Sequence, residues 1–181
     1  ALEWPLEQLL PNGDHEGFES LPDWLRFSLP VMGSFLLISL LLPFAPLDRK
    51  MGVSHLLERI SYHQGQLPIK NALLQFIAAL TALLTGHSAG KEGPAVHLGA
   101  ASGSLLGQKL RLPNNTLRIL AGCGTAAGIA AMFNTPLAGV IFAMEVVLME
   151  YSVLGFMPVM AAAATATLTM HLLFGSEQIL N

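Results

Sequence analysis

The sequence predicts an all-α membrane protein, and two observations predict this class. Of the 181 residues, 52% are hydrophobic and only 12% are charged, whereas soluble domains contain about 25% charged residues. A membrane-spanning helix needs about 20 mostly apolar residues, and five long stretches contain no Asp, Glu, Lys or Arg: 27–47, 71–90, 93–108, 119–144 and 151–176. Apolar and polar residues do not alternate within these stretches, so we expect helices rather than barrel strands.

The segment before the first apolar stretch is acidic. Residues 1–25 contain Asp and Glu but neither Lys nor Arg, which is the opposite of a secretory signal peptide. We therefore expect an extramembrane acidic segment over 1–25. The membrane-embedded part would then run over 26–181.

Proline and glycine interrupt the apolar stretches that follow. They gather at two joints, residues 90–94 and residues 134–139. A helix that breaks inside a membrane is tolerated where it lines a cavity or is buried in protein, and it often marks a transport site. The pattern thus predicts broken helices around a functional site.

Composition also excludes several classes of function. The net charge is −3, so no broad cationic surface for nucleic acid is expected. The single cysteine, Cys123, rules out an intrachain disulfide framework and a CxxC metal site, and we expect a buried, inert thiol. No nucleophile–base pair, metal-ligand spacing or cofactor loop is present, which predicts a protein that is not an enzyme and has no cofactor, metal site or catalytic residue.

The first joint places two charges inside an apolar region. Lys91 and Glu92 lie between Gly90 and Gly93, directly before Pro94, a residue that the first turn of a helix accepts. We therefore expect a helix over 94–110 whose free N–H groups form an anion site. Glu92 would compete with the anion for these groups and so act as a gate. The alternative is that Glu92 only caps its helix.

Two sequence blocks resemble a known family. Gly90-Lys91-Glu92-Gly93-Pro94, followed three residues later by His97, is similar to the GKxGPxxH signature of the CLC chloride channel and transporter family. The block 124–145, with Phe133-Asn134-Thr135-Pro136 at its centre, resembles a second motif of that family. Together, the two blocks indicate that the resemblance covers about residues 48–174.

The resemblance implies a CLC-type half of an inverted-repeat architecture with broken, tilted helices. The range 26–181 would be the N-terminal half of the transmembrane domain, with the second half of the same chain missing here. It further implies a homodimer in a lipid bilayer, the bacterial inner (plasma) membrane, with chloride or a related anion as the transported ligand. Glu92 matches the family's gating glutamate, which implies a channel of the voltage-gated type.

Departures from the family pattern leave the transported ion and the mechanism open. Met51, Gly52 and Val53 lie where the family's first helix-start motif contacts the anion, but Met51 replaces a serine. The expected anion-binding set is Met51, Gly52, Val53, Lys91, Glu92 and Gly93. Glu145 matches an acid on the proton pathway of the exchangers, whereas Val146 replaces the second acid. A passive channel is favoured; a proton-coupled chloride exchanger, a fluoride-handling member and a non-conducting membrane scaffold remain as alternatives.

Overall fold

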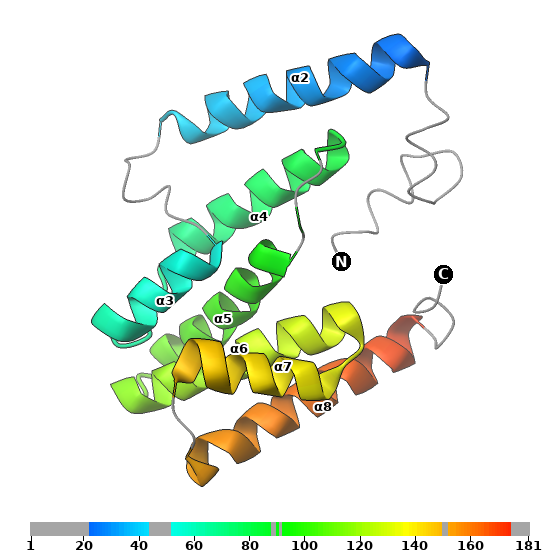
Figure 1. The fold of residues 1–181 in the computed structure, drawn as a ribbon. Helices are drawn as coiled ribbons and strands as arrows, with labels where there is room; N and C mark the ends of the chain where they lie inside the picture. Colours follow the sequence, from blue (N-terminus) through cyan, green and yellow to red (C-terminus); the bar gives the residue numbers. More distant parts are fainter. Residues whose placement is uncertain (1–21, 44–51, 88–89, 91, 150–151, 175–181) are drawn as a thin grey trace. The chain divides into compact units, whose positions relative to one another are not determined.

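The computed structural model describes residues 22–43, 52–87, 90, 92–149 and 152–174, and no strand occurs among them. This confirms the predicted all-α class. The elements in chain order are α2 (Asp23–Leu41), α3 (Gly52–Tyr62), α4 (Ile69–Leu84), α5 (Glu92–Lys109), α6 (Asn114–Phe133), α7 (Pro136–Phe142), the π-helical segment η2 (Ala143–Leu148) and α8 (Val153–Phe174) (Figure 1).

The chain divides into two compact units. The first unit comprises Ala1–Arg49 and Phe76–Lys91, and the second comprises Lys50–Gln75 and Glu92–Asn181. The division falls inside α4, so the N-terminal half of α4 belongs to the second unit and its C-terminal half to the first.

Within the first unit, α2 contacts the C-terminal end of α4 closely. A Cβ atom on Gly33 would overlap the Thr85 side chain, so glycine is required for this approach. The His87 ring joins the two helices, since its Nδ1 lies 2.8 Å from Thr85 Oγ1 and its Nε2 lies 3.0 Å from Ser34 Oγ. Both ring nitrogens of His87 are therefore used in packing.

In the second unit, α5 and α6 pack backbone against backbone. A Cβ on Gly99 would overlap the carbonyl of Gly124, and a Cβ on Gly103 would overlap the carbonyl of Leu120. A later residue of α5 thus meets an earlier residue of α6, so the two helices are antiparallel. Small residues at four-residue spacing permit this approach between membrane helices. Gly128 continues this contact, since a Cβ on Gly128 would meet the Ala95 carbonyl at 2.8 Å.

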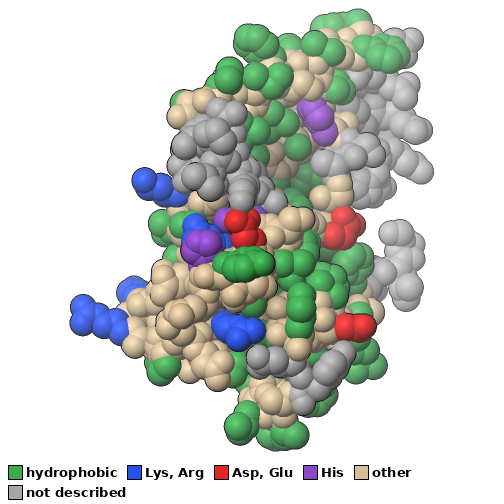
Figure 2. All heavy atoms as spheres, turned by 60° about the vertical axis from the view of Figure 1, so that its left-hand side comes forward, with side chains coloured by type: hydrophobic (Ala, Val, Ile, Leu, Met, Phe, Trp, Pro, Cys, Tyr) green, Lys and Arg blue, Asp and Glu red, His purple; other side chains and the backbone are tan. Residues whose placement is uncertain are grey.

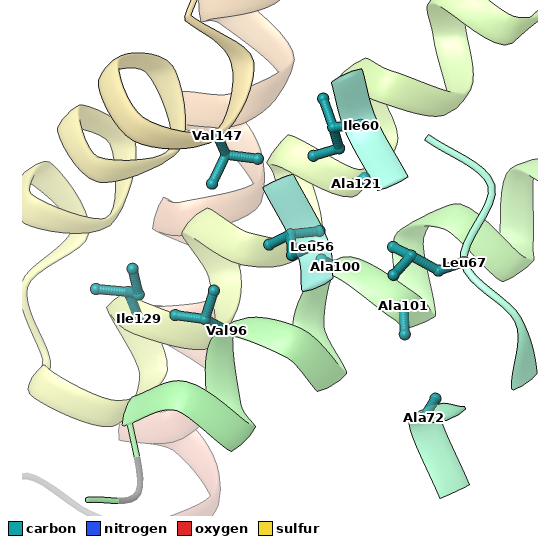
Figure 3. Packing of buried hydrophobic residues seen from close by; sticks show 10 residues of the cluster. All are labelled: Leu56, Ile60, Leu67, Ala72, Val96, Ala100, Ala101, Ala121, Ile129 and Val147. Atoms are coloured by element: carbon teal, nitrogen blue, oxygen red, sulfur yellow. The ribbon is translucent and has the colours of Figure 1, made fainter. Parts of the chain in front are cut away.

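A hydrophobic cluster joins α3, α5, α6 and η2 (Figure 3). Leu56 of α3 is completely buried beside Ala100 of α5, while Val96 and Ile129 connect α5 to α6. Val147 extends the cluster into η2. This cluster holds α3 against α5. The packing of α3 on α5 positions the candidate site.

A second cluster of mostly small residues joins α6, α7, η2 and α8. Ala126 and Ala130 of α6 lie against Val140 of α7 and Ala163 of α8, and all four are at most 3% exposed. Cys123 belongs to the same cluster as a buried free thiol, which confirms the expectation that this side chain is buried.

Two described helices are long and apolar enough to cross a membrane, by length and composition: Asn114–Phe133 and Val153–Leu173. Three other apolar helices are shorter, which the interruptions in the sequence explain. The stretch 119–144, for example, is split because Asn134 adopts a left-handed conformation (φ 51°, ψ 33°) and ends α6 before Pro136 begins α7. Among the described residues, the five apolar stretches therefore do not all form uninterrupted helices of membrane-spanning length.

Large hydrophobic side chains are exposed along several helices. Figure 2 shows hydrophobic side chains together with separate Lys, Arg, Asp and Glu side chains on one face. On α8, Leu154, Leu168 and Leu172 are between 59% and 86% exposed. Contiguous apolar surface of this kind is rare on soluble monomers, and it is suited to contact with lipid.

Candidate functional site

The first turns of α3 and α5 lie at the same end of the helix pair, because the two helices pack side by side and run in the same direction. Near their starts, His55 Nδ1 of α3 lies 3.1 Å from His97 Nε2 of α5. Beyond the end of α3, Ser104 of α5 donates to the Gly65 carbonyl at 2.6 Å and accepts from the Leu67 N–H at 3.0 Å. These contacts appear in the same order along both helices, which are therefore parallel (Figure 1). Two helix N-termini, each with its positive dipole end, thus lie at one end of the pair.

Helix α3 begins at Gly52 and is capped by a side chain from α4. Gly52 has φ +80°, a conformation that glycine adopts without steric cost. Its backbone N–H donates to Gln75 Oε1 at 2.9 Å, and Gln75 is only 7% exposed. Val53 follows in the helix and packs on the hydrophobic cluster of α3 and α5. Met51 lies outside the described residues.

Helix α5 begins at Glu92, two residues before the predicted start at Pro94. Pro94 is tolerated as the third residue because the first four N–H groups of a helix have no intrahelical acceptor in any case. The Glu92 side chain is exposed, and a Cβ added to Gly93 would meet nothing within 4 Å. A side chain at position 93 would therefore meet no described atom. Lys91 lies outside the part of the chain that the structure describes.

A chain of hydrogen bonds lies below the two helix starts. Arg59 Nε donates to His55 Nε2 at 3.4 Å, and a guanidinium nitrogen always carries its proton. His55 Nε2 must therefore be an acceptor, so neutral His55 carries its proton on Nδ1 and donates it to His97 Nε2. This assigns the remaining proton of neutral His97 to Nδ1. That nitrogen is buried and has no partner among the described residues.

His97, which belongs to the sequence motif around Glu92, is paired with His55 of α3. The two rings stack with centroids 5.4 Å apart and an interplanar angle of 28°. His97 is fully buried and His55 is 4% exposed. The pairing joins residues 42 positions apart in the chain, so no local pattern reveals it.

Glu145 lies in η2 and its side chain is exposed. Helix α7 ends at Phe142, and Ala143–Leu148 adopts the wider π-helical turn. In this turn Ala143, Met144, Val147 and Leu148 are all buried while Glu145 faces outward. A π-helical segment of this kind often occurs at functional sites.

Gln75 is the member of the site that the sequence reasoning missed. The sequence does contain an indication of its role, because Gln75 is a strongly polar side chain within the apolar stretch 71–90. A buried polar group requires a hydrogen-bond partner, but its position alone does not name Gly52 as that partner.

Comparison with known proteins agrees with the fold. A family model described as voltage gated chloride channel matches residues 33–181. A ClcB-like protein of Ralstonia nicotianae is 35% identical over 162 residues, covering 86% of this chain and 37% of that protein. The voltage-gated ClC-type chloride channel ClcB of Yersinia pestis is 30% identical over 190 residues, covering 99% of this chain and 44% of that protein. ClcB of Salmonella dublin is 30% identical over 172 residues, with coverage of 90% and 39%.

An all-helical fold with two helices that are long and apolar enough to cross a membrane is compatible with a helical membrane protein. The chain belongs to the voltage gated chloride channel family, the CLC family. This is a family of channels and transporters, in agreement with the prediction that the chain is not an enzyme. The chain spans less than half of the length of the curated relatives it matches.

Proposed function

We propose that the protein transports chloride across a membrane, as a channel of the voltage-gated type, with an anion site at the starts of α3 and α5. The observation that carries this proposal is the parallel packing of the two helices, which brings two positive helix ends together. Family membership supports it, since the named relatives are chloride channels. The proposed ligands are Val53 and Gly93, joined by Met51 and Lys91, which lie outside the described residues. Gly52 was expected in this set, but its backbone N–H instead donates to Gln75 Oε1.

Glu92 is the proposed gate of this site. It is the first residue of α5, so its carboxylate can reach the same N–H groups that an anion would occupy. Its exposed side chain is free of a packed environment that would immobilise it. An anion would enter when the carboxylate is protonated or turned away.

The proposal includes the assembly and the location of the protein. Residues 26–181 form the N-terminal half of a CLC-like transmembrane domain, with 1–25 as an extramembrane segment. The complete protein is an integral membrane homodimer, in a bacterial inner membrane. The exposed apolar side chains of α8 support contact with lipid.

The test uses the product of the complete gene, purified and reconstituted in liposomes. Chloride flux is measured from about pH 4, close to the ordinary pKa of a glutamate side chain, up to about pH 8, for wild type, Glu92→Gln and Glu92→Ala. Both variants are expected to alter chloride flux and to remove its pH dependence. Glu58→Gln is the control, because Glu58 lies farther along α3. Unchanged flux in the Glu92 variants at every pH would refute the gate.

The non-conducting scaffold is distinguished by the same preparation. Calorimetric titration of wild-type protein with chloride should show saturable binding if the two helix starts form an anion site. A protein that binds no chloride and carries no flux would be a scaffold, in which the helix breaks serve packing alone.

A further inference from the structure

The ring of His87 joins the end of α4 to α2 through two hydroxyl groups, and both hydroxyls already donate elsewhere. Ser34 Oγ donates to the Pro30 carbonyl at 2.8 Å, and Thr85 Oγ1 donates to the Thr81 carbonyl at 2.7 Å. A carbonyl oxygen can only accept, and each hydroxyl has a single proton to donate. The two hydroxyls can therefore offer His87 only their lone pairs.

The protons on the His87 ring follow from these bonds. Its Nε2 lies 3.0 Å from Ser34 Oγ and its Nδ1 lies 2.8 Å from Thr85 Oγ1, which are hydrogen-bond distances. Because neither hydroxyl has a proton left to give, each ring nitrogen must donate. A neutral imidazole carries one N–H and an imidazolium carries two, so the set of hydrogen bonds is complete only when the ring is charged.

Loss of one ring proton disturbs this arrangement. The deprotonated nitrogen would then face the lone pairs of a hydroxyl oxygen. That hydroxyl must either turn its proton toward the ring, giving up the carbonyl one helical turn earlier, or lose its contact with the ring. The neutral ring therefore holds α2 and α4 together less strongly than the charged ring does.

The backbone at the end of α4 holds the ring in place. The His87 N–H donates to the Ala82 carbonyl at 3.0 Å, and the Gly86 N–H donates to the Leu83 carbonyl at 3.1 Å. These two bonds form a Schellman motif, which requires the left-handed conformation that Gly86 adopts, with φ +72°. His87 is thus attached to a well-defined helix end, so a change in its side-chain bonds acts on the contact with α2.

We propose that His87 is a pH-dependent clasp between α2 and α4, closed when its ring is charged and weakened when its ring is neutral. Histidine is the side chain whose charge ordinarily changes between about pH 5 and pH 8. The clasp does not rest on the proposed function, since its contacts lie within the first unit. Only residues 88–91 separate it from Glu92 in the sequence, so it fixes the point from which the chain leaves α4 toward the proposed gate.

The charged groups on the two joined helices lie far along them from the ring. Helix α2 contains Asp23 about three helical turns before Ser34, and Arg26 about two turns before it. Helix α4 contains Lys70 in its first turn, at the end opposite His87. His87 follows the last turn of α4, where the negative end of the helix dipole favours a cation. The two hydroxyls and this helix end are therefore the groups that respond to the charge of the ring.

The test removes one acceptor of the clasp and compares two pH values. Thr85→Val keeps the shape of the side chain but deletes the hydroxyl that accepts from His87 Nδ1. Thr81→Val is the matched control on the same helix, because the Thr81 hydroxyl donates to the Ile77 carbonyl within α4. Both variants are made in the complete gene product, and their melting temperatures in detergent are compared with wild type at about pH 5 and about pH 8.

The loss of melting temperature in Thr85→Val is expected to be about twice as large at the acid pH, because a hydrogen bond from a charged donor is roughly twice as strong as one between neutral groups. Thr81→Val should show the same loss at both pH values. A loss in Thr85→Val that does not depend on pH would overturn the clasp.

A second measurement needs no variant that could fail to fold. Histidine labelled with ¹⁵N is incorporated into the complete wild-type protein in lipid, and solid-state NMR counts the protons on each ring nitrogen. His87→Gln identifies the signals of His87. Both nitrogens of His87 should carry hydrogen-bonded protons at about pH 5, and one should have lost its proton at about pH 8. A single ring proton at both pH values would overturn the proposal.

Discussion

The imidazole rings of His55 and His97 stack inside the protein with their facing nitrogens 3.1 Å apart. This contact joins α3 to α5 just below the two helix starts, where the proposed anion site lies. Arg59 Nε donates to His55 Nε2 at one end of this chain of hydrogen bonds. In the neutral pair, each histidine therefore carries its ring proton on Nδ1. The relative position of the two helix starts thus depends on a contact between two side chains as well as on the hydrophobic cluster.

The histidine pair predicts a coupled effect on stability. His55→Phe should lower the free energy of unfolding by about 1–3 kcal/mol, because His97 Nε2 and Arg59 Nε lose a buried partner. His97→Phe should have a similar cost. The double variant should be less destabilised than the sum of the two, since replacing both partners by apolar groups leaves fewer unsatisfied atoms.

Thermal unfolding in detergent of wild type, both single variants and the double variant provides the measurement. A coupling energy of about 0.5 kcal/mol or more would confirm that the two rings interact. Strict additivity of the two single effects would contradict the hydrogen-bonded pairing.

The glycine contact between α5 and α6 predicts that Gly99→Ala is destabilising. The added methyl group would overlap the Gly124 carbonyl, which is backbone and cannot turn aside. We expect a loss of about 1–3 kcal/mol or more in the free energy of unfolding. Gly93→Ala is the control for stability, because its Cβ would lie in open space, and it should gain up to about 1 kcal/mol from helix propensity. Equal melting temperatures for the two variants would show that the close approach is absent.

Ser104 is predicted to hold the loop that follows α3. Its hydroxyl donates to the Gly65 carbonyl and accepts from the Leu67 N–H and from Gln108 Nε2 at 2.9 Å. Ser104→Ala should cost about 1–3 kcal/mol, because buried backbone groups lose their partner.

The matched control for Ser104 is Ser102→Ala on the same helix. Ser102 is exposed and bonds only to the Gly99 carbonyl within α5, so its removal should change the free energy of unfolding by less than about 0.5 kcal/mol. Chemical or thermal unfolding of the two variants decides the prediction. Similar losses for both serines would refute the special role of Ser104.

The transport mechanism is predicted to be passive. Val146 follows Glu145 where the proton-coupled exchangers that the sequence resembles have a second acid. A chloride gradient across liposomes that contain the complete gene product should therefore drive no uptake of protons, as followed with a pH-sensitive dye. Proton uptake in step with chloride movement would establish the exchanger in place of the channel.

Local features of the chain were enough to predict the helical class and the start of α5. Gly90 and Gly93 flank Glu92, and Pro94 follows them. This pattern indicates a helix N-terminus without information from the rest of the chain. The break at Asn134 and Pro136 is equally local, because a left-handed residue ends α6 and proline begins α7. The π-helical turn at Glu145 was not predicted, since it depends on burying Met144 and Val147 against other helices.

The contacts that position the candidate site were not available from any local pattern. Gly52 meets Gln75 across 23 residues and His55 meets His97 across 42. Each pair forms only because α3 packs parallel to α5 and beside the first half of α4. A polar residue in an apolar stretch indicates that a partner exists, but only the packing of helices selects which one.

The sequence by itself therefore determined that this protein is helical, suited to a membrane and similar to the CLC family, because those properties follow from composition, helix-start residues and two motifs. Only the tertiary structure decided that the starts of α3 and α5 lie together, that Gln75 bonds to one of them, and that His55 and His97 form a pair. The physical reason is that hydropathy and helix signals act over a few neighbouring residues, whereas a binding site is made where distant helices pack and buried polar groups must find partners.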